Sequence, residues 1–266
     1  MLSTTLKGIC RLSVIPVRAE GSDRSEMITQ LLFGDHYEVL EKSQDQNWYK
    51  IKIYFDGYEG WICHKQWVEI SDDFYKDLSH LNHKIAVDLN TELTYSGKKI
   101  NILIGSVLPF SPQELFDMET QLQFNGKSEN SGERKGYRYL EEIAFRYLNA
   151  PYLWGGKMPF GIDCSGFTQQ VYRICGYNLK RDSWQQAEQG LTIDDLKDAH
   201  PGDLVFFAKE NKRVYHVGIL LADSKVIHAS GFVRVDRLDS TGIFNEDLNR
   251  YTHKLFSIKR ILKDEL

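Results

Sequence analysis

The sequence predicts an α+β protein in which two small all-β units precede a larger unit of helices and antiparallel strands. Residues 12–70 alternate short apolar runs with turn residues, and residues 84–110 repeat this pattern more weakly. After residue 136 apolar residues recur at the helical period, and alternating runs return beyond residue 201. A chain of 266 residues also exceeds one typical domain of about 100–200 residues, so two or three folding units are expected.

The first unit is predicted over residues 1–70 as a small β-barrel or β-sandwich. Between residues 12 and 70, β-branched and aromatic residues alternate with polar ones, and Gly or Asp interrupts the runs. We assign at least half of its aromatic residues to the core, because small barrels need large apolar side chains inside. The alternative is an aromatic-lined groove for peptides. The residues concerned are Trp48, Tyr49, Tyr54, Phe55, Tyr58, Trp61 and Trp67.

A second β-unit is predicted over residues 71–130. Its central part, residues 84–110, is again interrupted by Gly and has no long helical period. Residues 125–136, with the sequence NGKSENSGERKG, contain no apolar residue that could offset the entropy lost on ordering. This segment is predicted to be a linker or loop, and the third unit is placed over residues 131–266.

The third unit is predicted to begin with a helix and to continue with strands. Six apolar residues after the linker form a stripe at helical spacing: Tyr139, Leu140, Ile143, Ala144, Tyr147 and Leu148. The later runs DLVFFA, VYHVGILLA, KVIHAS, FVRVDRL and KLFSIKRIL alternate and are bounded by turn residues. Helices followed by antiparallel strands form an α+β arrangement.

The composition excludes several classes of protein. The 33 Lys and Arg against 37 Asp and Glu lack the basic excess that nucleic-acid binding needs. No apolar run reaches the roughly 18–20 residues of a membrane helix, so no membrane span is expected. Lys7 and Arg11 interrupt the apolar start, which excludes a secretory signal and predicts a cytoplasmic location. A trimmed sequence would allow a periplasmic or cell-surface location. The terminal KDEL is then treated as a coincidence.

Four cysteines in 266 residues are too few for a disulfide framework, so reduced thiols are expected. Cys164 follows a Gly-rich loop and precedes a segment with helical spacing, which places it at a helix N-terminus. Amide N–H groups and the helix dipole favour a thiolate there, and predict a nucleophile at neutral pH. The alternative is a buried structural cysteine, which suits Cys175 better.

A nucleophilic thiol needs a base, which usually lies far away in the sequence. In VYHVGILL the alternation puts His216 opposite an apolar face, and so away from the expected core. In KVIHAS the alternation separates His228 from Ile227 and Ala229. Two neighbouring strands can hold these imidazoles side by side, one as base and the other fixing its tautomer.

Neither a metal nor a cofactor is expected. Cys63, His64, His80 and His83 lack Cys-x-x-Cys spacing and lie on both sides of a predicted boundary. The Gly155-Gly156 pair lacks the Lys-Ser/Thr of a phosphate-binding loop, and the sequence has no GxGxxG motif.

The strings YLWGGKMPFGIDCSGF, RDSWQQA, PGDLVFF, HVGIL and VIHAS, in this order, resemble an NlpC/P60 cysteine peptidase domain over residues 137–262. The two β-units before it resemble bacterial SH3-like domains. The whole chain is most similar to γ-D-glutamyl-L-diamino acid endopeptidases, which trim murein peptides. The resemblance implies a papain-like α+β fold with no departure at the motif positions.

The resemblance also implies the roles of individual residues. Cys164 would be the nucleophile, His216 the base and His228 the polar residue that orients it. Tyr152 would join the Cys164 N–H in the oxyanion hole. Candidate substrate contacts are Trp154, Asp163, Ser165 and Ser183, with Glu59 as an acidic contact from the first unit. Asp163 fits a helix N-cap equally well, and Glu59 fits an ordinary exposed carboxylate.

The resulting hypothesis is a cysteine endopeptidase that cuts the γ-D-glutamyl-L-diamino acid bond of murein tripeptides or tetrapeptides, in cell-wall peptide recycling. The free ammonium of the N-terminal L-Ala would meet anions or carbonyls in a desolvated pocket. We expect a monomer. The alternatives are a peptidoglycan-binding protein and an amidase or acyltransferase of the same fold acting on intact cell wall. The sequence leaves open whether the diamino acid that follows the D-glutamate is lysine or diaminopimelate.

Overall fold

The computed structural model describes residues 5–80, 83–95, 97–108 and 122–263. The chain divides into two units, Met1–Glu133 and Arg134–Leu266. Two parts of the sequence predictions lie outside the described residues: Pro109 and Phe110 of the second β-unit, and the last three residues of the KDEL ending. Within the described part of the chain, every helix is too short or too polar to cross a lipid bilayer.

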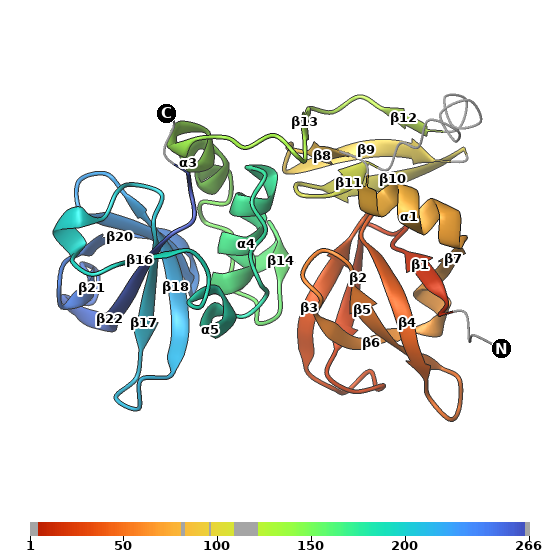
Figure 1. Cartoon of the computed structure of the whole chain (residues 1–266), viewed down its shortest axis with the longest axis horizontal. Helices are drawn as coiled ribbons and strands as arrows, with labels where there is room; N and C mark the ends of the chain where they lie inside the picture. The colour runs from red at the N-terminus through yellow and green to blue at the C-terminus, as the bar shows by residue number, and fades with distance from the viewer. Residues whose placement is uncertain (1–4, 81–82, 96, 109–121, 264–266) are drawn as a thin grey trace. The chain divides into compact units, whose positions relative to one another are not determined.

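The first unit opens with a seven-stranded antiparallel sheet in the order β3-β2-β6-β5-β4-β1-β7 (Figure 1). Its strands are β1 (Lys7–Ile9), β2 (Val14–Arg18), β3 (Met27–Leu32), β4 (His36–Lys42), β5 (Trp48–Ile53), β6 (Glu59–Cys63) and β7 (Val68–Ile70). A 3-10 helix, η1 (His64–Gln66), links β6 to β7. Each alternating run between residues 12 and 70 forms a strand, which confirms the predicted all-β unit.

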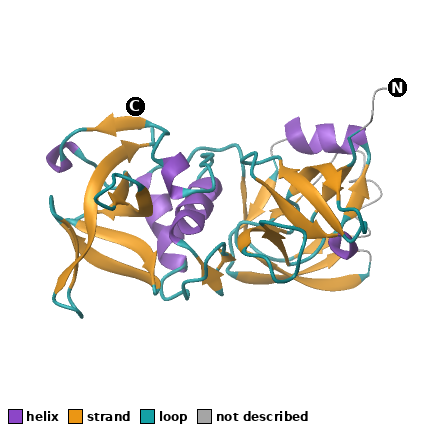
Figure 2. Cartoon of the chain, turned by 90° about the horizontal axis from the view of Figure 1, so that it is seen from below, coloured by secondary structure: helices purple, strands orange, loops and turns teal. Residues whose placement is uncertain are grey.

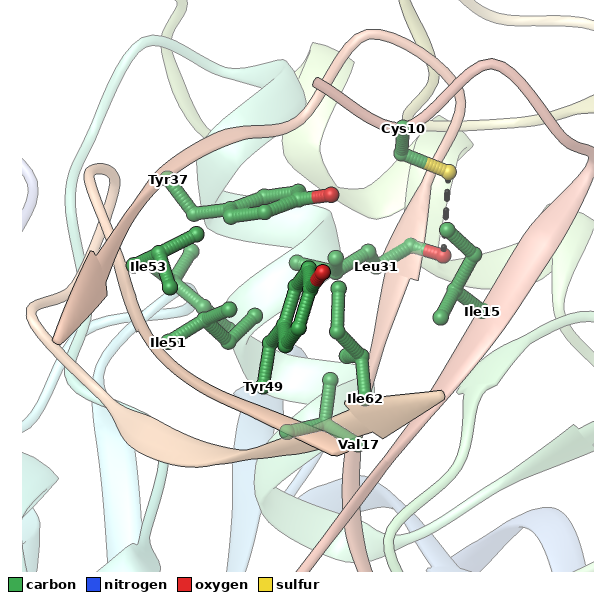
Figure 3. Close-up of a cluster of buried hydrophobic side chains, with 10 residues drawn as sticks. Cys10, Ile15, Val17, Leu31, Tyr37, Tyr49, Ile51, Ile53 and Ile62 are labelled. Carbon is green, nitrogen blue, oxygen red and sulfur yellow. Dashed lines mark hydrogen bonds between the residues drawn. The ribbon is translucent and has the colours of Figure 1, made fainter. Parts of the chain in front are cut away.

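The alternation that predicts these strands also builds their core. Figure 3 shows the side chains of Tyr37, Tyr49 and Ile51 directed toward one another in the buried core of this unit. Among the seven aromatic residues considered, Trp48 and Tyr49 are buried, and three more pack against the cluster: Phe55, Tyr58 and Trp67. This confirms that at least half of them serve the core.

The described residues between 71 and 133 form a helix and two three-stranded antiparallel sheets, in the orders β10-β9-β12 and β11-β8-β13. The elements are α1 (Asp72–His80), β8 (Lys84–Ala86), β9 (Asn90–Tyr95), β10 (Lys98–Leu103), β11 (Val107–Leu108), β12 (Leu122–Phe124) and β13 (Ser128–Asn130). The sequence prediction missed α1, whose only buried residue is Leu78. The prediction of a linker is wrong for β13, because pairing with β8 supplies backbone hydrogen bonds to a segment without apolar residues.

The two parts of the first unit share contacts. Phe33, which directly follows β3, packs in a buried cluster with Ala86, Leu93, Ile102 and Leu108. The Phe33 carbonyl accepts a hydrogen bond of 2.8 Å from the Val107 N–H. The prediction that residues 71–130 form a second, separate SH3-like barrel stays a prediction.

The second unit combines helices with a large antiparallel sheet, as predicted. Its helices are α3 (Tyr137–Arg146), α4 (Cys164–Ile174) and α5 (Ser183–Gln186), and Figures 1 and 2 show them on one side of the sheet. The sheet strands are β16 (Leu191–Ile193), β17 (Leu204–Ala208), β18 (Val214–Leu221), β19 (Lys225–Ser230), β20 (Phe232–Leu238), β21 (Gly242–Asn245) and β22 (Arg250–Arg260). The smaller elements are the hairpin strands β14 (Lys157–Met158) and β15 (Gly161–Ile162) and the 3-10 helix η2 (Leu196–Asp198).

The sheet of the second unit closes on itself. Its order is β16-β22-β17-β18-β19-β20-β21, and β21 also pairs with β22. Strands β17 to β22 therefore form a ring, which encloses a buried apolar cluster: Val205, Phe207, Leu220, Val226, Leu238, Ile243 and Ile258. Helix α4 packs on β18 and β19. Both faces of β18 are consequently buried over most of its length.

Replacing Ile51 by Ala tests the core of the first unit. Ile51 is fully buried in the cluster of Figure 3, and truncating such a side chain typically costs about 2–5 kcal/mol. We expect Ile51→Ala to lower the free energy of unfolding of this unit by that amount in urea denaturation. The adjacent exposed Lys52 provides the control, since Lys52→Ala should change it by less than about 0.5 kcal/mol. Equal effects of the two substitutions would contradict the assigned core.

Candidate active site

Cys164 is the first residue of α4, and Asp163 is the N-cap residue before it. This confirms the predicted helix N-terminus. The Asp163 carboxylate accepts a hydrogen bond of 2.7 Å from the Gly166 N–H, which satisfies one amide group of the first turn. The Cys164 N–H, in contrast, has no acceptor within the helix because it belongs to the first helical residue.

The Cys164 thiol lies beside the part of β18 that carries His216. Its sulfur is hydrogen-bonded with the Val217 backbone, and the Ser165 backbone makes a second such contact. Burial, and then the nearby Cys164, raise the pKa of Tyr215. Since Tyr215 and Val217 are the two neighbours of His216 along the strand, the structure brings the predicted nucleophile and the base-bearing segment together.

The protonation state of Cys164 differs from the prediction. Burial raises the pKa of the thiol to about 12, and the charge of Asp163 acts in the same direction. Hydrogen bonds from the backbone and the charge of Arg181 lower the pKa, but they do not outweigh burial. The prediction that the helix N-terminus makes this cysteine a thiolate at neutral pH is therefore wrong for the free protein. For Cys164 to act as the predicted nucleophile, a base must accept its proton.

His216 and His228 lie side by side on neighbouring strands. His216 Nε2 and His228 Nδ1 are 2.8 Å apart, and the two residues are 5% and 1% exposed. His216 is the cross-strand partner of Phe207, so it faces the same side as the buried cluster inside the ring. The pairing agrees with the sequence prediction, but the prediction that His216 points away from the core is wrong. The ring closure makes that side an interior one.

Both imidazoles are held neutral. Burial lowers the pKa of His216 well below its ordinary value, and the neighbouring His228 and His253 act in the same direction. Burial also lowers the pKa of His228, against the effect of Asp236. The ring of His253, which the sequence reasoning missed, stacks on His216 with centroids 4.2 Å apart, and burial lowers its pKa to about 4. A neutral His216 is able to accept a proton.

The hydrogen-bonded chain continues beyond His228 through residues that the sequence reasoning also missed. His228 Nε2 lies 2.9 Å from Asp236 Oδ2, and Arg234 Nη2 donates to Asp236 Oδ1 at 2.8 Å. The sequence FVRVDRL could have revealed the pair of Arg234 and Asp236, because alternation puts these two residues on the same face of a strand.

Asp163 and Ser165 belong to a buried charged cluster centred on Arg181, a fourth residue that sequence reasoning missed. Arg181 donates to both carboxylate oxygens of Asp163, at 3.0 and 2.6 Å, and to Ser165 Oγ at 2.9 Å. The Gly155 N–H also donates to Asp163 Oδ2, at 2.8 Å. Together with the Gly166 N–H and the Ser165 hydroxyl, which donates to Asp163 Oδ1 at 3.4 Å, these donors fill the acceptor positions of the carboxylate. Asp163 thus acts as an N-cap, and its contact with substrate stays a prediction.

Ser183 is the first residue of α5 and is 8% exposed. Gln186, at the other end of α5, is fully buried and connects that helix to α4. Its amide donates to the Ser165 carbonyl at 3.0 Å and accepts from Thr168 Oγ1 at 2.7 Å. Arg181 and Gln186 both lie in the quoted string RDSWQQA, which therefore has a structural role at the start of α4.

Tyr152 and Trp154 lie in the loop before Cys164. Burial raises the pKa of Tyr152, and the charges of the nearby Cys164 and Asp163 act in the same direction, so the Tyr152 hydroxyl lies near the Cys164 thiol. Trp154 is 61% exposed. The loop needs Gly156, because a Cβ there would lie 2.3 Å from the Gly161 carbonyl oxygen. The roles of Tyr152 and Trp154 stay predictions.

Glu59 begins β6 in the first unit, where its carboxylate lies 3.2 Å from Lys50 Nζ and is exposed. Its contact with substrate also stays a prediction. The other cysteines, Cys10, Cys63 and Cys175, are free thiols. Among the described residues, no group of three or more His, Cys, Asp or Glu side chains is arranged to hold a metal ion.

Replacing Arg181 by Met tests the charged cluster. Arg181 is 1% and Asp163 5% exposed, and removing one partner of a buried ion pair typically costs about 3–5 kcal/mol. We expect Arg181→Met to lower the free energy of unfolding of the second unit by that amount in urea denaturation. Arg146→Met is the matched control, because Arg146 pairs with the exposed Glu142 and should cost less than about 1 kcal/mol. Similar losses in both variants would show that the buried pair is not required.

Comparison with known proteins finds a family match in each of the two units. The NlpC/P60 family model matches residues 149–251, and the model of the bacterial dipeptidyl-peptidase SH3 domain matches residues 17–66. A γ-D-glutamyl-L-lysine dipeptidyl-peptidase of Bacillus subtilis is 30% identical over 223 residues, which cover 76% of this chain and 71% of the relative. Dipeptidyl-peptidase 6 of Lysinibacillus sphaericus is 26% identical over 258 residues, covering 86% and 91%.

Solved structures share the fold. An NlpC/P60 family protein from Bacillus cereus has a TM-score of 0.80 at 20% identity, covering 97% of this chain and all of that chain (100%). An NlpC/P60 endopeptidase from Photobacterium damselae has a TM-score of 0.72 at 17% identity, covering 96% and 70%. The matched region of the second unit contains Cys164, His216 and His228. With an SH3 domain before its peptidase domain, the chain belongs to the NlpC/P60 family of cysteine peptidases.

Proposed function

We propose that this protein is a peptidoglycan peptidase that hydrolyses the bond between γ-D-glutamate and the following L-diamino acid in peptides with a free N-terminal L-alanine. The observation that carries the proposal is the position of Cys164 at a helix start beside the strand that holds the His216–His228 pair. The names of the relatives, γ-D-glutamyl-L-lysine dipeptidyl-peptidases, support the choice of bond. Cleavage of such released peptides would serve cell-wall recycling.

The first half of the reaction begins with the Cys164 thiol. His216 accepts the thiol proton while the sulfur attacks the carbonyl carbon of the γ-D-glutamyl group, because neither thiolate nor imidazolium is favoured at rest. His216 Nε2 is hydrogen-bonded to His228, so Nδ1 is the nitrogen left to take the proton. His216 then gives that proton to the departing amine of the diamino acid, which leaves a thioester on Cys164.

The tetrahedral intermediate carries a negative oxygen that needs hydrogen-bond donors. The Cys164 N–H has no acceptor within α4, and the Tyr152 hydroxyl stays protonated because burial raises its pKa. Both groups are therefore available as donors to this oxygen, as expected of an oxyanion hole.

The second half of the reaction releases the dipeptide. A water molecule loses a proton to His216 and attacks the thioester carbonyl, and the Cys164 sulfur leaves as the imidazolium returns the proton. The products are L-Ala-γ-D-Glu with a new carboxylate and the diamino acid with a free amine. A dipeptidyl-peptidase releases two residues from an amino end, which supports the requirement for a free L-Ala ammonium.

Replacing Cys164 by Ala should abolish cleavage of L-Ala-γ-D-Glu-diaminopimelate and of its lysine counterpart. Mass spectrometry of each tripeptide incubated with the protein detects the products, and circular dichroism verifies the fold. Cys175→Ala is the control, since Cys175 is a buried thiol at the other end of the same helix and should leave turnover in place. Equal turnover by the Cys164 variant would overturn the assignment of the nucleophile.

Acetylating the amino group of the L-Ala should suppress cleavage strongly. Acetylation removes the positive charge and adds bulk at the end of the substrate that a dipeptidyl-peptidase must recognise. Competition between the free and the acetylated tripeptide in one reaction measures the ratio of kcat/KM values directly. Equal rates would favour the alternative of an enzyme acting on intact cell wall, where this amine is bonded to the glycan.

A further inference from the structure

A buried carboxylate lies at the far end of the histidine pair. Asp236, on β20, is 5% exposed and has a different partner on each oxygen: His228 Nε2 at 2.9 Å from Oδ2, and Arg234 Nη2 at 2.8 Å from Oδ1. The same Arg234 nitrogen also donates to the exposed carboxylate of Asp247 at 2.8 Å. Arg234 is a donor only, so Oδ1 of Asp236 accepts, whereas the direction of the bond between Oδ2 and His228 Nε2 depends on which of the two groups carries the proton.

The direction of each hydrogen bond follows from this carboxylate. Burial acts to raise the pKa of Asp236, but hydrogen bonds from His228 and Arg234 outweigh it and hold the pKa below its ordinary value. Asp236 is therefore ionised at neutral pH and accepts a proton donated by His228 Nε2. Because burial keeps His228 neutral, its Nδ1 carries no proton and accepts from His216 Nε2. His216 is neutral as well, so its own Nδ1 is left without a proton.

We propose that Asp236 is a positioning residue, which acts through His228 to fix the tautomer of His216 in which Nδ1 is free to accept the Cys164 proton. The proposal rests on the proposed function of Cys164 and His216. It adds the carboxylate that sets the donor and acceptor at each hydrogen bond of the chain Asp236–His228–His216, which we call the histidine relay. In this arrangement Arg234 holds the carboxylate of Asp236 in place.

The other groups around the relay do not supply this direction. His253 stacks on His216, and its Nδ1 lies 2.9 Å from Thr252 Oγ1, so it contacts the relay through its ring face. Tyr215 stacks on His253 in turn, with centroids 5.8 Å apart. Asp247 reaches only Arg234 among the hydrogen bonds of the described residues. The carboxylate bonded to His228 is that of Asp236.

The substitution Asp236→Asn tests the proposal because it reverses the relay with almost no change of shape. The Asn oxygen must face Arg234, which only donates, so the amide NH2 must face His228 Nε2. His228 Nε2 then becomes an acceptor and its Nδ1 a donor, which places the proton of His216 on Nδ1. We expect kcat/KM to fall at least about 100-fold, mainly through kcat, as for the loss of a general base.

A second substitution separates tautomer control from a merely structural role. In the double variant Arg234→Met with Asp236→Asn, no donor holds the amide oxygen, so the amide can turn and accept from His228 again. We expect the double variant to recover at least about tenfold of the activity lost in Asp236→Asn. Asp247→Asn is the matched control, which removes an exposed contact of Arg234 and should leave kcat/KM within about twofold.

Nitrogen NMR of isotope-labelled histidine reads the tautomers without substrate. In the unsubstituted protein, His216 and His228 should both carry the proton on Nε2, and in Asp236→Asn both should carry it on Nδ1. Any other tautomer in the unsubstituted protein overturns the proposal, even if the variant does not fold. Full activity of Asp236→Asn, or a loss that the double variant does not reverse, also overturns it. A failure of the proposed function appears differently, as cleavage by Cys164→Ala with the tautomers as expected.

Discussion

The hydrogen bond of 2.8 Å between His216 and His228 is the interaction on which the candidate active site depends. It forms because β18 and β19 are neighbours whose register pairs Gly218 with His228, which brings the ring of His228 alongside that of His216. Gly218 leaves room there, since a Cβ at this position would lie 3.1 Å from the Cβ of His228. Closure of the sheet then removes both rings from water.

The start of α4 is fixed by a separate polar cluster. Asp163 caps the helix and receives the guanidinium of Arg181, while Gln186 holds the Ser165 carbonyl from α5. Burying these groups is unfavourable unless each is paired, and the paired arrangement has few alternatives. The cluster therefore fixes the position of Cys164, whereas the hydrogen bonds of His228 and Asp236 fix the position of His216, the proposed proton acceptor.

Sequence patterns predict the parts of this site that follow from local chemistry. The Asp-Cys-Ser-Gly segment after a Gly-rich loop indicates the start of α4, and period-2 alternation indicates that His216 and His228 can meet. Arg181 and Asp236 were missed because charged residues are usually exposed, and only the folded structure brings them to partners buried in the same unit. The helix α1 and the strand β13 were missed for a related reason, because each has little apolar surface to mark it.

Burial has opposite effects on the two groups that are proposed to react, and in the proposed mechanism this makes tautomer control necessary. It disfavours the charged form of each, so it raises the pKa of the Cys164 thiol and lowers that of the His216 imidazole. The proton therefore rests on sulfur and must move as the sulfur attacks. In a site that stored a thiolate and an imidazolium, the proton would already have left the sulfur. In a neutral pair, a proton on Nδ1 of His216 leaves the thiol without an acceptor.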